Sequence, residues 1–423
     1  MIFHFFTAPF LFPHFMVIME EMYVKEVFFM GKVMDILETI GHFGKNPDGS
    51  YTRRLYSTEF FQALEAAEGL LRQAGLTTSR DAAGNLRAVL PGTDPEAKHI
   101  LLGSHLDTVP SGGLYDGAYG VAAAIGCVRR LRKEGRKLRH TVEVYAFNGE
   151  EASPLGGTFG SRTLVGLTDP DQPLLRETLE GFGHSVEEIL ACRRDFSDAA
   201  CYLETHIEQG GRLEKEGIQL GIVSGISNIV RYLVTAEGQS NHGGTTPMED
   251  RQDAMVAMAK LIVFADAACR KIGHSLVFTA GKIQCSPNAA NVVPGKVTCT
   301  FEMRNVDRQY TDELIREIRA ATELIPDARF TVQQLIHKDS ALCDPKLMEA
   351  FEKAADSLGA TWQVMPSGAG HDADSIAHRI PVGMLFIPSH LGISHSGKEY
   401  TPPEDVERGG EVLYRTLVEL DGE

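Results

Sequence analysis

Five short motifs in this sequence carry side chains of the types that bind metal ions in proteins. The residues are His105, Asp116, the adjacent pair Glu150 and Glu151, His206 and His395. Imidazoles and carboxylates together can hold a pair of divalent ions, one carboxylate can bridge the ions, and a carboxylate beside a ligand can accept protons. The pattern therefore predicts a metal-dependent hydrolytic site.

Each motif taken singly has a simpler explanation. A His at a strand end is commonly structural, an Asp flanked by Gly commonly belongs to a turn, and two adjacent Glu residues commonly mark a solvated corner. Asp107, two residues after His105, can fix the tautomer of that imidazole. Agreement among five motifs, rather than any one of them, favours the metal site.

The elements around the motifs predict that the ligands meet at one edge of a sheet. Apolar runs at 98–104 and 141–147 are typical of strands, and an Ala-rich run at 118–133 that ends in arginines is typical of a helix. Strand, helix and strand form a βαβ crossover, and open α/β sheets place their sites at the carboxyl ends of strands. A further amphipathic helix is expected at 52–75.

Between about 217 and 335 the pattern changes to that of a smaller α+β unit. The expected elements are strands at 228–236, 275–284, 296–304 and 329–336 and helices at 251–272 and 311–324. A helix at 345–358 and a strand at 381–387 then return to the first pattern. The smaller unit is therefore expected to be inserted into the larger one.

We predict three parts in the chain. Residues 31–216 and 337–423 form an α/β catalytic domain built on a mixed sheet with helices on both faces, and residues 217–336 form the inserted α+β domain. Residues 1–30 form an extension that begins with an apolar, aromatic stretch but lacks the basic start of a signal peptide. We expect this extension to be disordered and not to be a targeting segment.

Composition argues against two kinds of binding partner and indicates a cellular location. The 423-residue chain has a formal net charge of -16, and it has no basic stripe to hold nucleic acid or an anionic membrane, so neither is an expected partner. Its seven cysteines are scattered and form no Cys-x-x-Cys pair. This usage is typical of reduced thiols and predicts a cytoplasmic protein.

The motifs, in their order along the chain, resemble those of the M20-type amidohydrolases called the hydantoinase/carbamoylase family. The resemblance extends from about residue 33 to residue 420 and rests on GSHLDTVPSGGLYDGAYGV, NGEEASPLGGTFGSRTLVG, ETHIEQG, GQSNHGGTTPMEDRQDA, PNAANVVPG, FEMRN, SGAGHDA and IPSHLGISHSGKEYT. It is stronger than any single motif, because the order of eight segments is preserved.

The resemblance implies two divalent ions in each chain, and imidazole and carboxylate ligands suit zinc, manganese, cobalt or nickel. The implied ligands are His105, Asp116, Glu151, His206 and His395. Asp116 would be shared by the two ions, with His105 and His206 on one ion and Glu151 and His395 on the other. Glu150 would be the catalytic base.

The same resemblance implies a homodimer that is formed through the inserted domain. His242 of this domain would reach the active site of the neighbouring subunit and stabilise an oxyanion there. The implied substrate-binding residues are Gln209, His242, Asn291, Arg304, Gly370 and His371. Arg304 suits a substrate carboxylate, because a guanidinium can bind a carboxylate with two hydrogen bonds. Without the resemblance, Arg304 would be typical of a surface salt bridge.

The implied reaction is hydrolysis of the carbamoyl or ureido C–N bond of a small carboxylate substrate. An N-carbamoyl-L-amino acid would give the amino acid, ammonia and carbon dioxide. Allantoate is the nearest alternative, and an M20 aminoacylase or peptidase is a second, which His206 disfavours because peptidases carry an acidic ligand there. A binding protein that has kept the fold without the activity is the alternative from another class, and its metal content would distinguish it.

Overall fold

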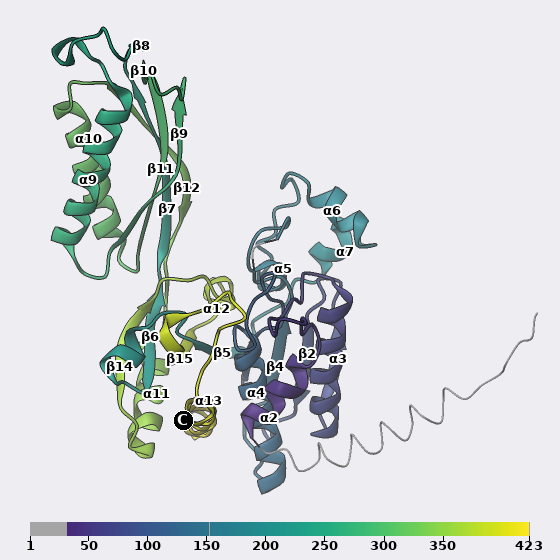
Figure 1. Ribbon diagram of the computed structural model, residues 1–423. Helices are drawn as coiled ribbons and strands as arrows, with labels where there is room; N and C mark the ends of the chain where they lie inside the picture. The colour runs from purple at the N-terminus through teal and green to yellow at the C-terminus, as the bar shows by residue number, and fades with distance from the viewer. Residues whose placement is uncertain (1–31, 152, 423) are drawn as a thin grey trace, which may run out of the picture.

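The structure, a computed structural model, describes residues 32–151 and 153–422 (Figure 1). The expectation for residues 1–30 lies outside these described residues. Among them a nine-stranded sheet has the order β1-β2-β4-β3-β5-β15-β6-β13, with β14 paired to β6. Its strands are β1 (Thr77–Arg80), β2 (Leu86–Leu90), β3 (His99–His105), β4 (Val142–Phe147), β5 (Ala199–Ile207), β6 (Leu220–Ile226), β13 (Ala341–Leu342), β14 (Trp362–Ser367) and β15 (Val382–Ile387).

The four central strands β4, β3, β5 and β15 run parallel to one another. They are almost entirely buried, which explains why the sequence shows continuous apolar runs there and not alternation. β1 pairs antiparallel with β2, β2 with β4 and β6 with β15, so the sheet is mixed. Because the central strands are parallel, their carboxyl ends lie at one edge.

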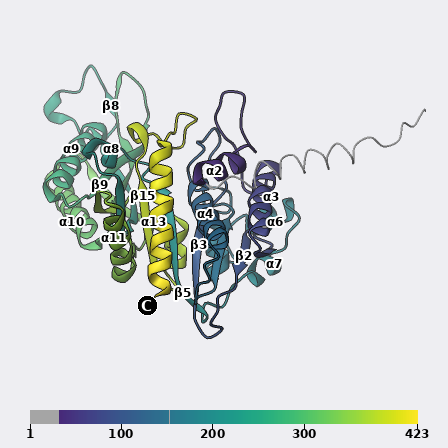
Figure 2. The same cartoon turned by 90° about the horizontal axis from the view of Figure 1, so that it is seen from below.

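Helices cover both faces of this sheet. One face packs against α2 (Val33–Gly41), α3 (Thr58–Gln73), α4 (Ala118–Glu134), α11 (Pro345–Leu358) and α13 (Pro403–Asp421), several of which are seen in Figure 2. The other face packs against α5 (Phe159–Val165), α8 (Arg212–Glu216) and α12 (Asp372–Ile376), with α6 (Leu175–Gly181) and α7 (Val186–Ala191) in a smaller cluster beside α5. The predicted α/β fold with helices on both faces is confirmed.

A second sheet stands apart from the first and projects from it (Figure 1). Its antiparallel order is β12-β7-β11-β9, and α9 and α10 cover one face. The elements are β7 (Asn228–Glu237), β9 (Val277–Ser286), β11 (Lys296–Asn305), β12 (Arg329–Lys338), α9 (Ala254–Ile272) and α10 (Arg308–Leu324). A two-stranded ribbon of β8 (Asn241–His242) and β10 (Val292–Val293) lies at its far end (Figure 1).

Two of the observed bounds differ from the expected ones, one because of strand pairing and the other because of helix capping. Residues 217–336 were expected to form the inserted unit, but β6 pairs within the large sheet, so the second sheet begins only at Asn228. The helix expected at 52–75 begins at Thr58, because the Ser57 side chain accepts the Phe60 N–H as an N-cap.

Glu143, in β4, is the centre of a buried ion-pair cluster at the end of the strand opposite the predicted ligands. Its carboxylate accepts two hydrogen bonds from Arg87, both at 2.7 Å, one from Arg194 at 2.8 Å and one from the Tyr145 hydroxyl at 2.8 Å. His99 lies 2.6 Å away. Two guanidinium groups already satisfy this carboxylate, so the cluster is a structural ion pair and not a cation site.

Glu143→Gln is expected to lower the free energy of unfolding at pH 7 by about 3 kcal/mol, because two guanidinium groups would lose their buried partner. Burial alone would raise the pKa of Glu143, but its hydrogen bonds hold the pKa well below the ordinary 4.5. The stabilisation is therefore present above pH 4.5 and is lost as the pH falls towards the folded-state pKa. Urea unfolding of both proteins between pH 7 and pH 3 should show a difference that shrinks on acidification. A difference that stays constant with pH would contradict this role.

Candidate metal centre

The carboxyl edge of the large sheet gathers the predicted ligands. His105 ends β3, and His206 lies one residue before the end of the neighbouring strand β5. Asp116 lies in the loop that leads into α4, Glu150 and Glu151 follow β4, and His395 follows β15. Because β4, β3, β5 and β15 are neighbours in that order, these separate motifs come together in space.

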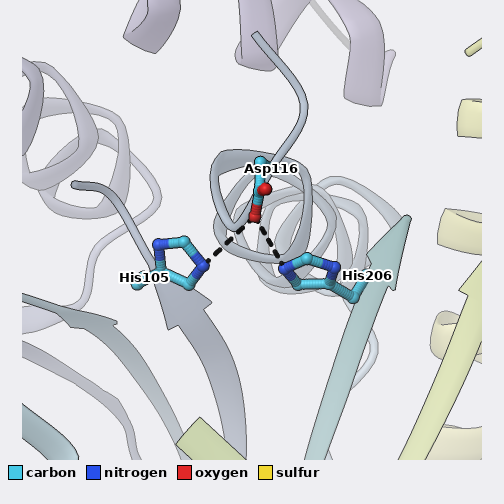
Figure 3. Close-up of side chains that lie close together, drawn as sticks. All are labelled: His105, Asp116 and His206. Carbon is cyan, nitrogen blue, oxygen red and sulfur yellow. Dashed lines mark ion pairs between the residues drawn. The ribbon is translucent and has the colours of Figure 1, made fainter. Parts of the chain in front are cut away.

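His105, Asp116 and His206 form the first group (Figure 3). The Nε2 atoms of His105 and His206 lie 3.5 and 3.2 Å from Asp116 Oδ1. The Nδ1 atoms lie 3.0 Å from the carbonyl oxygen of Asp107 and 2.9 Å from that of Ile207. A carbonyl accepts hydrogen bonds only, so each Nδ1 carries a proton, which leaves Nε2 as the ring atom that can bind a cation.

This arrangement makes the first group a fit for a cation. The two Nε2 atoms converge on one carboxylate oxygen of Asp116, and a cation placed between the three atoms would be bound by all of them. All three side chains are buried. Burial alone would raise the pKa of Asp116, yet contacts with His105, His206 and His395 hold that pKa well below its ordinary value. The carboxylate is thus charged and available as a ligand.

Asp116, Glu151 and His395 form the second group. His395 Nε2 lies 3.3 Å from Asp116 Oδ2 and 3.4 Å from Glu151 Oε1. Glu151 Oε1 is buried and has no hydrogen-bond partner among the described residues. A buried carboxylate oxygen without a partner is costly in a native protein and is what a bound cation would satisfy. Asp116 belongs to both groups, as a bridging ligand must.

His395 of the second group and the neighbouring Gln209 have left-handed backbone conformations, which residues other than glycine rarely adopt. The φ angles are 57° for Gln209 and 54° for His395. Each such residue costs on the order of 1 kcal/mol and persists where surrounding contacts impose it. Gln209 donates a hydrogen bond from Nε2 to Asp116 Oδ2 at 2.8 Å. The strain therefore coincides with the side chains that surround Asp116.

Glu150 lies next to the first group without belonging to it. Its Oε2 is 3.9 Å from His105 Nε2, and its side chain is 12% exposed. Burial raises the pKa of Glu150 well above its ordinary value, and the neighbouring carboxylates of Asp372, Glu151 and Asp107 also raise it. A carboxylate in this position can exchange a proton with a molecule at the cluster.

Asp107 supports the site in a way that differs from the expectation. Its main-chain carbonyl, and not its carboxylate, accepts the His105 Nδ1 proton. The carboxylate instead accepts the backbone N–H groups of Gly149, Glu150 and Glu151 at 2.8, 3.1 and 3.1 Å. Asp107 therefore positions both the imidazole and the loop that carries the two adjacent glutamates.

Arg304 and Gly370 lie near this edge. Arg304, at the end of β11 closest to the large sheet, donates a hydrogen bond from Nη1 to the Gly368 carbonyl at 2.7 Å. A Cβ on Gly370 would lie 3.7 Å from Glu150 Oε1, so Gly370 faces the predicted base. His371 is buried, with its ring edge-on to His206 at 4.6 Å between centroids. The His371 imidazole therefore packs against the imidazole of His206.

His242 and Asn291 are not near the metal groups of the same chain. At the β8–β10 ribbon, His242 ends β8 and Asn291 immediately precedes β10, and the Gly243 N–H donates to the Asn291 carbonyl at 2.7 Å. The ten residues of β7 separate this ribbon from the large sheet, a length of about 30 Å. The Gly244 and Thr245 N–H groups donate to His242 Nδ1 at 3.1 and 3.2 Å, so the exposed Nε2 carries a proton.

Sequence reasoning missed residues that hold the ligands in place. Glu399 accepts the backbone N–H groups of Tyr115 and Asp116 at 2.8 and 3.0 Å and so fixes the loop of the shared ligand. Arg53 is fully buried and donates from Nε to the Leu106 carbonyl at 2.7 Å. Glu399 lies within the His395 motif and could have been suspected. Arg53 had no local signal, because its partners are far away in the sequence.

The chain is similar to known proteins over most of its length. The profile of Peptidase family M20/M25/M40 matches residues 101–419. The chain is 34% identical to the N-carbamoyl-L-amino acid amidohydrolase of Geobacillus stearothermophilus, over 91% of this chain and 97% of that protein. It is 35% identical to the allantoate amidohydrolase of Escherichia coli, over 93% of this chain and 98% of that protein.

A solved structure of a hydantoinase/carbamoylase family amidase from Burkholderia ambifaria is similar throughout. It has a TM-score of 0.82 and 30% sequence identity, and the match covers 92% of this chain and 96% of that one. Sequence and structure thus identify the same family. The chain belongs to Peptidase family M20/M25/M40 and, within it, to the hydantoinase/carbamoylase family of amidohydrolases.

Proposed function

We propose that this protein hydrolyses the carbamoyl or ureido C–N bond of a small substrate that carries a carboxylate, with an N-carbamoyl-L-amino acid as the first candidate. The observation that carries the proposal is the shared carboxylate of Asp116 between two imidazole-containing groups, with Glu150 beside them. The names of relatives at 34% and 35% identity support carbamoyl and ureido substrates.

Two divalent ions would be held by the two groups, one by His105, Asp116 and His206 and the other by Asp116, Glu151 and His395. When bound, such ions polarise a carbonyl and favour ionisation of an attacking water. The ligand types suit zinc, manganese, cobalt or nickel.

The residues of the chain supply the remaining steps. Glu150 accepts a proton from the attacking water and returns it to the leaving nitrogen. Arg304 binds the substrate carboxylate, while Gln209 and Gly370 line the space beside Asp116 and Glu150. The protonated Nε2 of His242 donates a hydrogen bond to the oxyanion that develops on the carbonyl oxygen.

His242 and Asn291 can take part only if a second chain supplies them. We therefore propose a homodimer in which the residues expected to form the inserted domain, 217–336, deliver this ribbon to the partner. Apolar side chains on the outer surface of α9 support an interface there, with Val263 70% and Val256 42% exposed. Exposed apolar groups gathered on one helix are typical of contact surfaces.

We further propose a cytoplasmic location, since all seven cysteines are free and most of them are buried. Within the described part of the chain, every helix is too short or too polar to span a bilayer.

Allantoate is the second candidate substrate. It also carries a carboxylate and ureido groups, and a relative named for it is as similar as the relative named for N-carbamoyl-L-amino acids. The decisive assay gives metal-loaded protein a panel of N-carbamoyl-L-amino acids, allantoate and N-acyl-L-amino acids and measures both ammonia and free amino acid. Both are needed because hydrolysis of an N-acyl-L-amino acid frees the amino acid without ammonia. Turnover of N-acyl-L-amino acids alone would contradict the proposal.

Arg304→Lys is expected to raise KM at least about tenfold with a smaller change in kcat, because lysine keeps the charge but loses the planar pair of donors. A descarboxy analogue of the substrate should be turned over poorly by the wild-type enzyme. Steady-state kinetics with acid and analogue measure both effects. Equal kcat/KM for the two compounds with wild-type enzyme would remove Arg304 from carboxylate binding.

A further inference from the structure

Arg304 is itself held by a carboxylate two residues earlier on the same strand. Its Nε and Nη2 groups both donate to Glu302 Oε1, at 2.9 and 2.7 Å. Nη1 donates to the Gly368 carbonyl at 2.7 Å. Three of the five N–H donors of this guanidinium thus have acceptors within the described residues. Glu302 occupies the edge formed by Nε and Nη2, and one N–H of Nη1 and one N–H of Nη2 remain for a ligand.

Arg231, on the neighbouring strand β7, balances the charge of Glu302. It lies directly opposite Glu302 in the β7–β11 register and donates from Nε to Glu302 Oε2 at 2.7 Å, with a second contact from Nη2. Each oxygen of Glu302 therefore serves one arginine. Two guanidinium groups and one carboxylate leave a net charge of +1, so the group as a whole still attracts an anion.

Burial and hydrogen bonding restrict the motion of the Glu302 and Arg304 side chains. Only 18% of the Glu302 side chain and 32% of the Arg304 side chain are exposed. Burial alone would raise the pKa of Glu302, but hydrogen bonds from Arg231 and Arg304 lower it below the ordinary value. Glu302 is therefore a charged, doubly bound acceptor. A planar guanidinium fixed along one edge by such an acceptor has little freedom to rotate.

The group of Arg231, Glu302 and Arg304 lies beside the loop that borders the predicted active site. Arg304 is bound to Gly368, and Gly370, two residues later, faces Glu150. A substrate carboxylate at Arg304 would thus lie next to the loop that borders the predicted base.

We propose that Glu302 is the positioning residue for Arg304 and, through it, a determinant of specificity for carboxylate substrates. Glu302 presents the Nη1–Nη2 edge of Arg304 to the substrate, and Arg231 keeps the three-residue group cationic. The inference rests on the proposed role of Arg304 in binding the substrate carboxylate.

The test compares kcat and KM for an N-carbamoyl-L-amino acid and for its descarboxy analogue. Glu302→Ala should raise KM for the acid about tenfold, keep kcat within about threefold and leave kcat/KM for the analogue unchanged. Glu302→Gln keeps an acceptor but loses the charge and should have a smaller effect in the same direction. Arg231→Gln should also raise KM for the acid, because Glu302 would then cancel the charge of Arg304.

Glu237→Gln is the matched control. Glu237 lies at the other end of β7 and is also shared by two basic residues, Arg329 at 2.8 Å and Lys296 at 3.5 Å. The Glu237→Gln variant should keep the wild-type KM for both the acid and the descarboxy analogue. Thermal unfolding verifies that each variant is folded. If Glu302→Ala does not fold, Glu302→Gln alone tests the positioning role.

The outcomes separate the inference from the proposal on which it rests. If wild-type enzyme prefers the acid but both Glu302 variants keep the wild-type KM, the positioning role is wrong. An equal loss of kcat/KM for acid and analogue would also overturn it, since that pattern indicates general structural damage. If wild-type enzyme does not distinguish the two compounds, the proposed role of Arg304 fails first.

Discussion

Replacing Glu150 with Gln is expected to lower kcat by at least about a hundredfold while the protein keeps its bound metal. Glu150 is beside the first ligand group and not part of it, with Oε2 3.9 Å from His105 Nε2. An amide of the same shape preserves the packing but cannot accept the proton of the attacking water. Steady-state kinetics together with metal analysis of the purified variant measure the two quantities separately.

Glu143→Gln is the control for this experiment, because it removes a carboxylate from the opposite end of β4. It should keep kcat within about twofold at a temperature at which both variants are folded. Full activity in a Glu150→Gln protein of verified metal content would remove Glu150 from the mechanism.

Mixing two inactive variants is expected to restore roughly a quarter of the wild-type activity. His242→Ala lacks the proposed oxyanion donor, and Glu150→Gln lacks the base. A mixed dimer contains one site that takes Glu150 from the first chain and His242 from the second. Random exchange of equal amounts makes about half of the dimers mixed, each with one of two sites complete. Activity is followed against time after mixing, with exchange verified by differently tagged chains.

Recovery is expected because His242 cannot reach the metal groups of its own chain. The ten residues of β7 hold His242 and Asn291 about 30 Å from the large sheet. The control takes each variant alone through the same exchange procedure, and each should stay inactive. Verified exchange without recovery would show that His242 does not act across the dimer.

The strand ends that carry chemistry were predictable because their signal is local. The apolar runs before His105 and before Glu150 are continuous, and they become β3 and β4, two buried parallel neighbours. His206 then lies near the end of β5, and His395 lies in the loop that follows the neighbouring strand β15. Propensity and pattern agree at these positions, so sequence reasoning found them.

The features that were missed depend on contacts between distant segments. Arg53 meets the Leu106 carbonyl, and Glu399 meets the backbone at Asp116, and neither pairing leaves a mark in the local pattern. The boundary near 217 was placed one strand early, because β6 looks like any other apolar strand and only its pairing with β15 assigns it to the large sheet. Glu302 was similarly hidden, since an acid two residues before an arginine is ordinary on a strand face.

The central claim is that a metal-dependent site at the carboxyl edge of the sheet cleaves a ureido C–N bond. The most direct measurement is ammonia release from an N-carbamoyl-L-amino acid by chelator-stripped protein, before and after titration with manganese, cobalt, nickel or zinc. The account predicts no turnover without metal, recovery that saturates at about two ions per chain, and equal amounts of ammonia and amino acid. Undiminished ammonia release from protein shown to be free of metal would contradict it.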